Sequence, residues 1–115
     1  MGLHQGDILF IDLNPAKGTE TKKKRPCMIV SNDEYNRHFN TVLVIPISSS
    51  DKYRTQEKFI HSPFFKRIDL KTIQGTALLQ HVRAVDPRIR SNGEVVGRVP
   101  VADISAVLDV LKEFC

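Results

Sequence analysis

Polar side chains suited to phosphate chemistry stand beside three apolar runs of this 115-residue sequence. Arg25 opens one run, Ser48 closes another, and Gln80, Arg83 and Asp86 follow in a third stretch. An arginine guanidinium stays charged and can grip two phosphate oxygens at once. A hydroxyl or carboxylate beside it can exchange hydrogen bonds or protons with the same group. If the three runs are neighbouring strands, we expect these polar groups to meet at one rim of a small barrel.

The basic residues are gathered in a few places and give the chain a formal net charge of +4. A basic surface attracts polyanions through counterion release, which favours a nucleic acid or an acidic protein as the partner. A solvated charged loop is the alternative reading, and charge alone does not decide between the two. The densest run is Lys22, Lys23, Lys24 and Arg25, and further groups are Lys66 with Arg67, and Arg83, Arg88 and Arg90.

The composition is that of one globular domain spanning residues 1–115. Hydrophobic residues make up 41% of the chain and charged residues 26%, which suits a compact core and a polar surface. No apolar run approaches the roughly 20 residues of a membrane helix, and the first residues lack the pattern of a signal peptide. We therefore expect a cytoplasmic protein in which Cys27 and Cys115 are free thiols.

Several classes of site are not expected from this sequence. It has no glycine-rich phosphate loop, no pair of zinc ligands at the usual spacing and no serine in a nucleophile elbow. The four histidines are scattered, so we expect neither a metal nor a cofactor. Tryptophan is absent and aromatic residues make up only 7% of the chain, which argues against a broad platform for stacking bases.

The elements that position the polar residues follow from hydrophobic patterning. A terminal amphipathic helix over residues 103–114 has the clearest pattern, with apolar residues at spacings of three and four. Asn92-Gly93 is typical of a hairpin turn. Together these elements predict an α+β fold with mostly antiparallel strands. We predict strands at residues 7–13, 26–30, 41–47 and 76–82, a weaker strand at 57–61, and a short capped helix at 33–38.

The order and spacing of five motifs resemble the MazF/PemK/Kid family, small bacterial toxins that cut RNA without a metal. These motifs are Gly6-Asp7-Ile8, Gly18-Thr19-Glu20, Arg25-Pro26, the hydroxyl of Ser48, and the stretch from Gln80 to Asp86. The resemblance covers most of the chain, and no single motif would suffice. It implies a small SH3-like antiparallel β-barrel with a short helix and a C-terminal amphipathic helix, and it implies a homodimer.

The resemblance also implies an activity and roles for individual residues. The protein would be the toxin of a type II toxin-antitoxin system, an endoribonuclease that cleaves single-stranded mRNA and leaves a 2′,3′-cyclic phosphate and a 5′-hydroxyl. Its partner would be an antitoxin whose acidic tail occupies the RNA groove. The implied catalytic residues are Arg25, Ser48 and Glu20, with Glu20 as general base, and the implied RNA-binding residues are Lys22, Lys23, Lys24, Ser49, Gln80, Arg83 and Asp86.

Each role has a structural alternative. Arg25 could cap a strand and pair with Glu20, Ser48 could be an ordinary turn serine, and Arg83 could form a structural salt bridge with Asp86. For the whole protein the alternatives are a non-catalytic poison of DNA gyrase on the same barrel, or a degenerate member that binds RNA without cutting it. The intact arginine and serine motifs, and the absence of tryptophan from residues 110–115, favour the enzyme.

Overall fold

The computed structural model describes residues 2–13 and 24–114. Within these residues no helix has the length and apolar character needed to cross a membrane. In chain order the elements are β1 (Asp7–Asp12), β2 (Lys24–Ile29), α1 (Asp33–His38), β3 (Val42–Ser48), α2 (Lys52–Thr55), α3 (Glu57–Ile60), β4 (Phe65–Asp69), β5 (Gln74–Leu78), the 3-10 turn η1 (Leu79–His81), β6 (Arg83–Val85), α4 (Pro87–Arg90), β7 (Gly97–Arg98) and α5 (Val101–Leu111).

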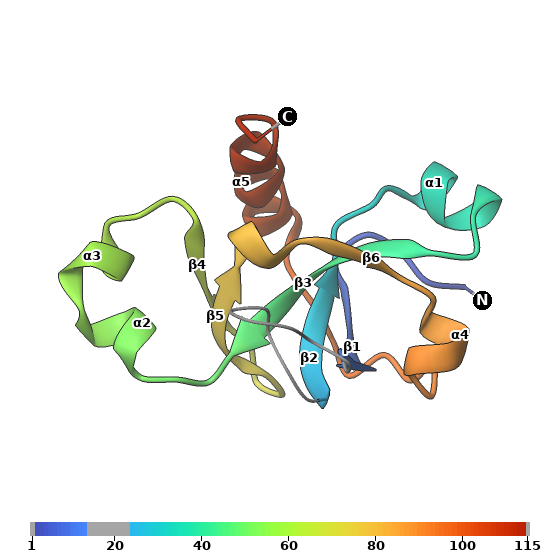
Figure 1. Ribbon diagram of the computed structural model, residues 1–115, viewed down its shortest axis with the longest axis horizontal. Coiled ribbons are helices and arrows are strands. Elements are labelled where there is room, and N and C mark those ends of the chain that lie inside the picture. The colour runs from blue at the N-terminus through green and yellow to red at the C-terminus, as the bar shows by residue number, and fades with distance from the viewer. Residues whose placement is uncertain (1, 14–23, 115) are drawn as a thin grey trace.

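The described strands form one curled antiparallel sheet in the order β4-β5-β3-β2-β1-β7, and β6 also pairs with β3 (Figure 1). The strand β3 lies at its centre and changes partner along its length. Val44 faces Ile29 of β2 on one side and Arg83 of β6 on the other, whereas Ile47 and Ser48 pair with β5. This change of partner bends the sheet into a half-barrel, which confirms the expected α+β class.

Successive side chains of a strand point to opposite faces of the sheet, and because the central strand β3 is apolar at nearly every position, both faces carry apolar side chains. One face packs under α5, which stands against the sheet in Figure 1 and contributes the buried Ile104 and Val107. A second cluster fills the other face. The first cluster includes Ile8, Met28, Ile45, Ile47, Ile68, Ala77 and Leu79, and the second Leu9, Ile11, Leu13, Cys27, Ile29, Val42, Val44 and Val85.

The short helix α1 follows the expected capping chemistry. The side chain of Asn32 accepts a hydrogen bond of 2.8 Å from the backbone N–H of Tyr35, and Asp33 and Glu34 supply acidic groups in the first turn. The helix spans Asp33–His38, as the sequence predicts.

Three local predictions were wrong. Residues 57–61 were expected as a strand, but Glu57–Ile60 is the helix α3, whose Phe59 packs on the rings of Tyr53 and Phe65. The expected strand 76–82 breaks after Leu78 into the turn η1, and a separate strand β6 follows. The expected hairpin at Asn92-Gly93 does not form, because the residues before it are the helix α4. Gly93 still adopts a turn conformation, with a φ of 78°.

Candidate functional site

Arg25 and Ser48 lie on the same face of the sheet, near one another across two neighbouring strands. The pairing of β2 with β3 places Cys27 opposite Pro46. When this register is continued by two residues, Arg25 comes opposite Ser48. Arg25 shares a face with Cys27, and Ser48 is on the face opposite to Ile47, which points toward α5. The two residues on which the sequence analysis depends therefore converge.

The same row of residues continues across β5 and β4. Ser48 pairs with Thr76 of β5, and Thr76 pairs with Arg67 of β4. The row thus runs from Arg25 through Ser48 and Thr76 to Arg67, and antiparallel partners point to the same side of a sheet. Sequence reasoning did not assign Thr76 or Arg67 to the site, although it noted Arg67 as part of a basic group. The alternation of polar and apolar residues in Arg67-Ile68-Asp69 is a signal that could have indicated a strand there.

Ser48 is held at the end of β3 by its neighbours. It is 6% exposed, and its hydroxyl oxygen accepts a hydrogen bond of 3.2 Å from the backbone N–H of Ser50. Among the described residues no acceptor takes its hydroxyl proton, so the hydroxyl can still donate to a phosphate oxygen. Gly75 allows the close approach of β5, because a Cβ built on it would lie 2.6 Å from the carbonyl oxygen of Ser48.

Arg83 brings a second guanidinium to this face. It is half-buried in β6, where its Nη1 donates a hydrogen bond of 3.3 Å to the carbonyl oxygen of Leu13. Burial raises the pKa of the Cys27 thiol to about 12, and the positive charges of Arg83 and Arg25 act in the opposite direction. Both arginines are therefore close enough to one sulfur atom to influence it, and together they make this part of the face cationic.

Asp86 has a structural role in the described part of the chain. Its carboxylate caps α4 by accepting hydrogen bonds from the backbone N–H of Arg88 at 3.0 Å and from the Arg88 guanidinium at 2.9 and 3.1 Å. The side-chain hydrogen bond from Arg88 is the main reason why the pKa of Asp86 is lowered. Arg83 forms no ion pair with Asp86 within the described residues, so the salt bridge considered above is not present.

The remaining sequence-predicted residues divide into two groups. Lys24 is exposed at the start of β2, opposite Asp12, and Ser49 is exposed directly after β3. Gln80 is exposed in η1. Glu20, Lys22 and Lys23 lie outside the described residues.

The chemistry of this arrangement suits an anion. Two guanidiniums and a serine hydroxyl provide hydrogen-bond donors with positive charge, which is the donor set that a phosphate group prefers. In the described ranges, no group of three or more histidine, cysteine, aspartate or glutamate residues is placed to hold a metal ion. The positions of Arg25, Arg83 and Ser48 on one face support phosphate binding by their side chains.

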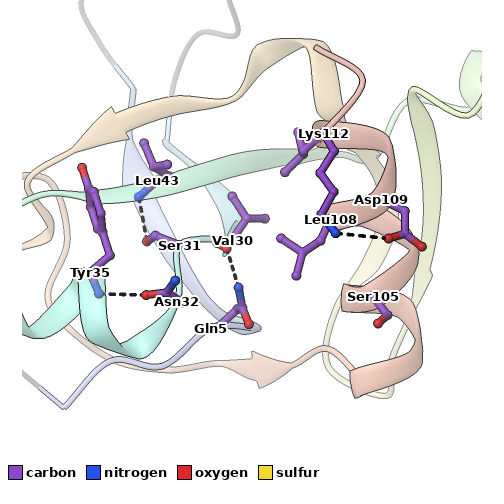
Figure 2. A pocket seen from close by; sticks show the side chains of 11 residues that line it. Gln5, Val30, Ser31, Asn32, Tyr35, Leu43, Ser105, Leu108, Asp109 and Lys112 are labelled. Carbon is purple, nitrogen blue, oxygen red and sulfur yellow. Dashed lines mark hydrogen bonds and ion pairs between the residues drawn. The ribbon is translucent and has the colours of Figure 1, made fainter. Parts of the chain in front are cut away.

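A pocket lies away from the row of Arg25, Ser48, Thr76 and Arg67, between α5 and the segment that joins β2 to α1 (Figure 2). It has a volume of about 580 Å³, and none of the sequence-predicted residues lines it. Much of its polar lining is already engaged: the Ser31 hydroxyl accepts from the N–H of Leu43, and Gln5 donates to the carbonyl of Val30 (Figure 2). This pocket offers no catalytic group comparable to the row on the other face.

Comparisons with known proteins agree with this fold. A family described as the PemK-like, MazF-like toxin of type II toxin-antitoxin systems matches residues 4–115. Endoribonuclease MazF of Staphylococcus epidermidis is 25% identical over 109 residues, which cover 94% of this chain and 89% of that protein. The crystal structure of MazF from Deinococcus radiodurans superposes with a TM-score of 0.80 at 22% identity, covering 97% of this chain and 94% of that one. A mycobacterial endoribonuclease in complex with its cognate antitoxin superposes with a TM-score of 0.72 at 17% identity, covering 99% and 98% of the two chains.

Proposed function

The chain belongs to the PemK-like, MazF-like toxin family of type II toxin-antitoxin systems, and from this premise we propose that it is a metal-independent endoribonuclease that cleaves single-stranded mRNA in the cytoplasm. The observation that carries the proposal is that the register of β2 and β3, continued by two residues from the pair Cys27 and Pro46, places Arg25 opposite Ser48 on one face of the sheet. Relatives such as MazF of Staphylococcus epidermidis carry the endoribonuclease activity in their names.

RNA supplies its own nucleophile, the 2′-hydroxyl next to the scissile phosphate. The protein must help remove the proton of that hydroxyl, stabilise the charge on the pentacoordinate phosphorus and protonate the departing 5′-oxygen. Arg25 performs the second task because its guanidinium binds two phosphate oxygens, and the Ser48 hydroxyl donates to the same group. The products are a 2′,3′-cyclic phosphate and a 5′-hydroxyl.

The other polar residues have supporting roles in this proposal. Arg83 adds positive charge beside Arg25, and because a guanidinium keeps its proton it is a stabiliser of charge and a poor proton donor. Glu20 is proposed as the general base. Lys22, Lys23 and Lys24 attract the RNA backbone, and Ser49, Gln80 and Asp86 contact the RNA near the cleaved bond.

The proposal includes two protein partners. One is a second copy of the chain, which would form a homodimer. The other is an antitoxin with an acidic tail that binds the basic sequence run from Lys22 to Arg25 and excludes RNA. The structure of a mycobacterial relative in complex with its cognate antitoxin supports the second partner.

Cleavage of a long single-stranded RNA in the presence of EDTA tests the activity. We expect the wild-type protein to cut it and an Arg25→Ala variant to cut about 10²- to 10³-fold more slowly, because one preorganised donor to the transition state is lost. Circular dichroism establishes that the variant folds. The matched control is Arg37→Ala, which removes an exposed arginine paired with Glu34 on α1 and is expected to leave the rate unchanged.

The other outcomes contradict the proposal in different ways. Fragments that form only after magnesium is added would contradict metal independence. New ends that polynucleotide kinase labels only after phosphatase treatment would contradict a 5′-hydroxyl product. Intact RNA together with a block of DNA supercoiling by gyrase would favour the gyrase poison, and RNA that is bound but not cut would favour a degenerate member.

A further inference from the structure

An aromatic pocket lies beside the row that contains Ser48. It has a volume of about 270 Å³ and lies between α2 and α3 on one side and β4 and β5 on the other. In Figure 1, α2 and α3 form a projection next to β4 and the end of β3. The pocket is lined by Tyr53, Arg54, Phe59, Ile60, Phe65, Arg67 and Thr76.

Three of the lining residues form a compact group of rings. The ring of Tyr53 is stacked on that of Phe65 at a centroid distance of 5.3 Å, and Phe59 packs edge-on against both at 4.8 Å. Each of the three residues is only half-buried, so the group retains exposed ring surface. Exposed aromatic surface beside a cationic site is what an unpaired nucleobase stacks on.

Two polar side chains of the pocket have no partner among residues 2–13 and 24–114. Thr76 is 2% exposed, and its hydroxyl makes no hydrogen bond there. Arg67 is exposed and forms no ion pair or hydrogen bond with the described residues. Arg54, by contrast, is held by Asp51 at 2.7 Å. No buried side-chain nitrogen or oxygen atom of the described residues lacks a hydrogen-bond partner, so the Thr76 hydroxyl, which has none, is accessible from the pocket and can exchange a hydrogen bond with a ligand.

The charge around the pocket is also suited to RNA. Residues 51–67 contain five lysines and arginines but only two acidic residues. The ammonium groups of Lys52 and Lys58 lie 5.0 Å from the ring centroids of Tyr53 and Phe59, which puts positive charge at the edge of the aromatic group. The pocket therefore combines stacking surface with a field that attracts a polyanion.

The position of the pocket relates it to the proposed cleavage site. Ser48, Thr76 and Arg67 occupy neighbouring positions on three adjacent strands. Strands are spaced by about 4.8 Å, so the backbone of Arg67 is roughly 10 Å from that of Ser48. A phosphate bound at Ser48 would place the base of an adjacent nucleotide within reach of Thr76, and the next phosphate near Arg67.

We propose that this pocket is a nucleobase site, in which a base of single-stranded RNA next to the cleaved bond stacks on the exposed ring surface of Tyr53, Phe59 and Phe65 and exchanges a hydrogen bond with the Thr76 hydroxyl. The inference rests on the proposed function, and it assigns to these residues the selection of the base at one position of the target. The structural alternative is that the rings serve only as a small core beneath α2 and α3.

Tyrosine fluorescence tests the site without requiring cleavage. The chain has two tyrosines and no tryptophan, so a Tyr35→Phe variant leaves Tyr53 as the only strong emitter. The probes are four short oligonucleotides with 2′-O-methyl groups, each carrying a different base at one position; they lack the nucleophile and stay intact. We expect at least one to quench the emission of Tyr53 with a saturable dependence on concentration, and the four to differ in affinity.

Two variants in the Tyr35→Phe background separate base binding from a purely structural role. Thr76→Val preserves the side-chain shape and should weaken the preferred oligonucleotide by about 2- to 12-fold, as expected for one lost neutral hydrogen bond. Phe59→Leu should weaken it by roughly 5- to 150-fold, as expected for lost stacking. The control for the first change is Thr72→Val, an exposed threonine outside the pocket, which should have no effect.

Sequencing of the cleaved ends of a long RNA gives a second readout. Thr76→Val is expected to relax the base preference at one position while the protein still melts cooperatively. The inference is overturned if Tyr53 does not respond to any oligonucleotide, or if Thr76→Val and wild type show the same affinities and the same preference. Quenching by oligonucleotides without any RNA cleavage would instead contradict the proposed nuclease and leave the base site supported.

Discussion

At the scale of single residues, the face of the sheet that carries Arg25 and Ser48 combines two arginines with a thiol that is poorly suited to ionise. Cys27 is completely buried, and its Sγ donates to the carbonyl oxygen of Arg25 at 3.5 Å. Burial raises its pKa to about 12, although the charges of Arg83 and Arg25 act to lower it. The loss of solvation therefore outweighs two nearby positive charges, and the thiol acts as a small apolar side chain in the second cluster.

The raised pKa of Cys27 predicts a loss of stability at alkaline pH. The ordinary thiol pKa near 9.0 applies to the unfolded chain, so between pH 9 and 12 the unfolded state releases a proton that the folded state keeps. The free energy of unfolding should then fall by up to about 1.4 kcal/mol per pH unit from this group. Urea denaturation from pH 8 to 10.5, in a Cys115→Ser background, measures the slope. A Cys27→Ala variant should show a shallower slope, and equal slopes would contradict the assignment.

At the scale of elements, the row of site residues depends on how closely β5 approaches β3. A Cβ at Gly75 would lie 2.6 Å from the Ser48 carbonyl oxygen and 2.7 Å from Cγ2 of Ile47. Real side chains do not approach so closely, so any larger residue must push the two strands apart. Gly75 thereby positions Ser48 through the close approach of the two strands.

Gly75→Ala is expected to damage both the stability and the activity. Overpacking of this kind typically costs about 1–3 kcal/mol, which lowers the melting temperature by roughly 4–15 °C. The displaced Ser48 should lower kcat for RNA cleavage even at temperatures where the variant remains folded. The matched control is Gly97→Ala, whose Cβ would meet only side-chain atoms, the nearest at 3.1 Å on Thr72. A Gly75→Ala protein with wild-type melting temperature and rate would show that the close approach is unimportant.

The elements also explain which parts of the structure the sequence could predict. The strand β3 and the helix α5 have strong local patterns, and the cap of α1 is a local hydrogen bond. The bounds of α1 were predicted to the residue and those of β3 to within one residue, whereas α5 begins two residues and ends three residues earlier than predicted. The helix α3 was mistaken for a strand because its identity depends on the contact of Phe59 with Phe65, which a short window of sequence does not contain.

The candidate site was predictable to a similar extent. Arg25 and Ser48 were identified from motif order, and the β2–β3 register brings them together. The contributions of Thr76 and Arg67 depend on the pairing of β5 with β3 and β4, and register between strands is set by the whole barrel. The low aromatic content also concealed the base site, because three rings that are separate in the sequence gather in one pocket.

At the scale of the whole molecule, the positive charge is unevenly compensated. Four arginines form ion pairs with carboxylates at distances of 2.7 to 2.9 Å, and none of the four belongs to the row from Arg25 to Arg67. Arg83 and Arg67 have no ion pair among the described residues, and the exposed Lys24 begins the strand that carries Arg25. The four paired arginines are Arg37, Arg54, Arg88 and Arg98. Cationic side chains thus lie at both ends of the row, with Lys24 and Arg25 on β2 and Arg67 on β4.

This distribution predicts which lysines and arginines set the salt dependence of RNA binding. Each phosphate neutralised on a single strand contributes about 0.7 to the slope of log affinity against log salt concentration. Lys24→Ala and Arg67→Ala should therefore each reduce the slope by about 0.7, whereas Arg37→Ala should leave it unchanged. Arg37 is already paired with Glu34 at 2.7 Å, and its helix α1 lies at the opposite end of the molecule from α2 and α3 (Figure 1).

Fluorescence anisotropy with a 2′-O-methylated RNA between 50 and about 300 mM salt gives the slopes without cleavage. Equal reductions in all three variants would mean that RNA responds to the net charge of +4 as a whole, and the row would not be the path of the RNA backbone.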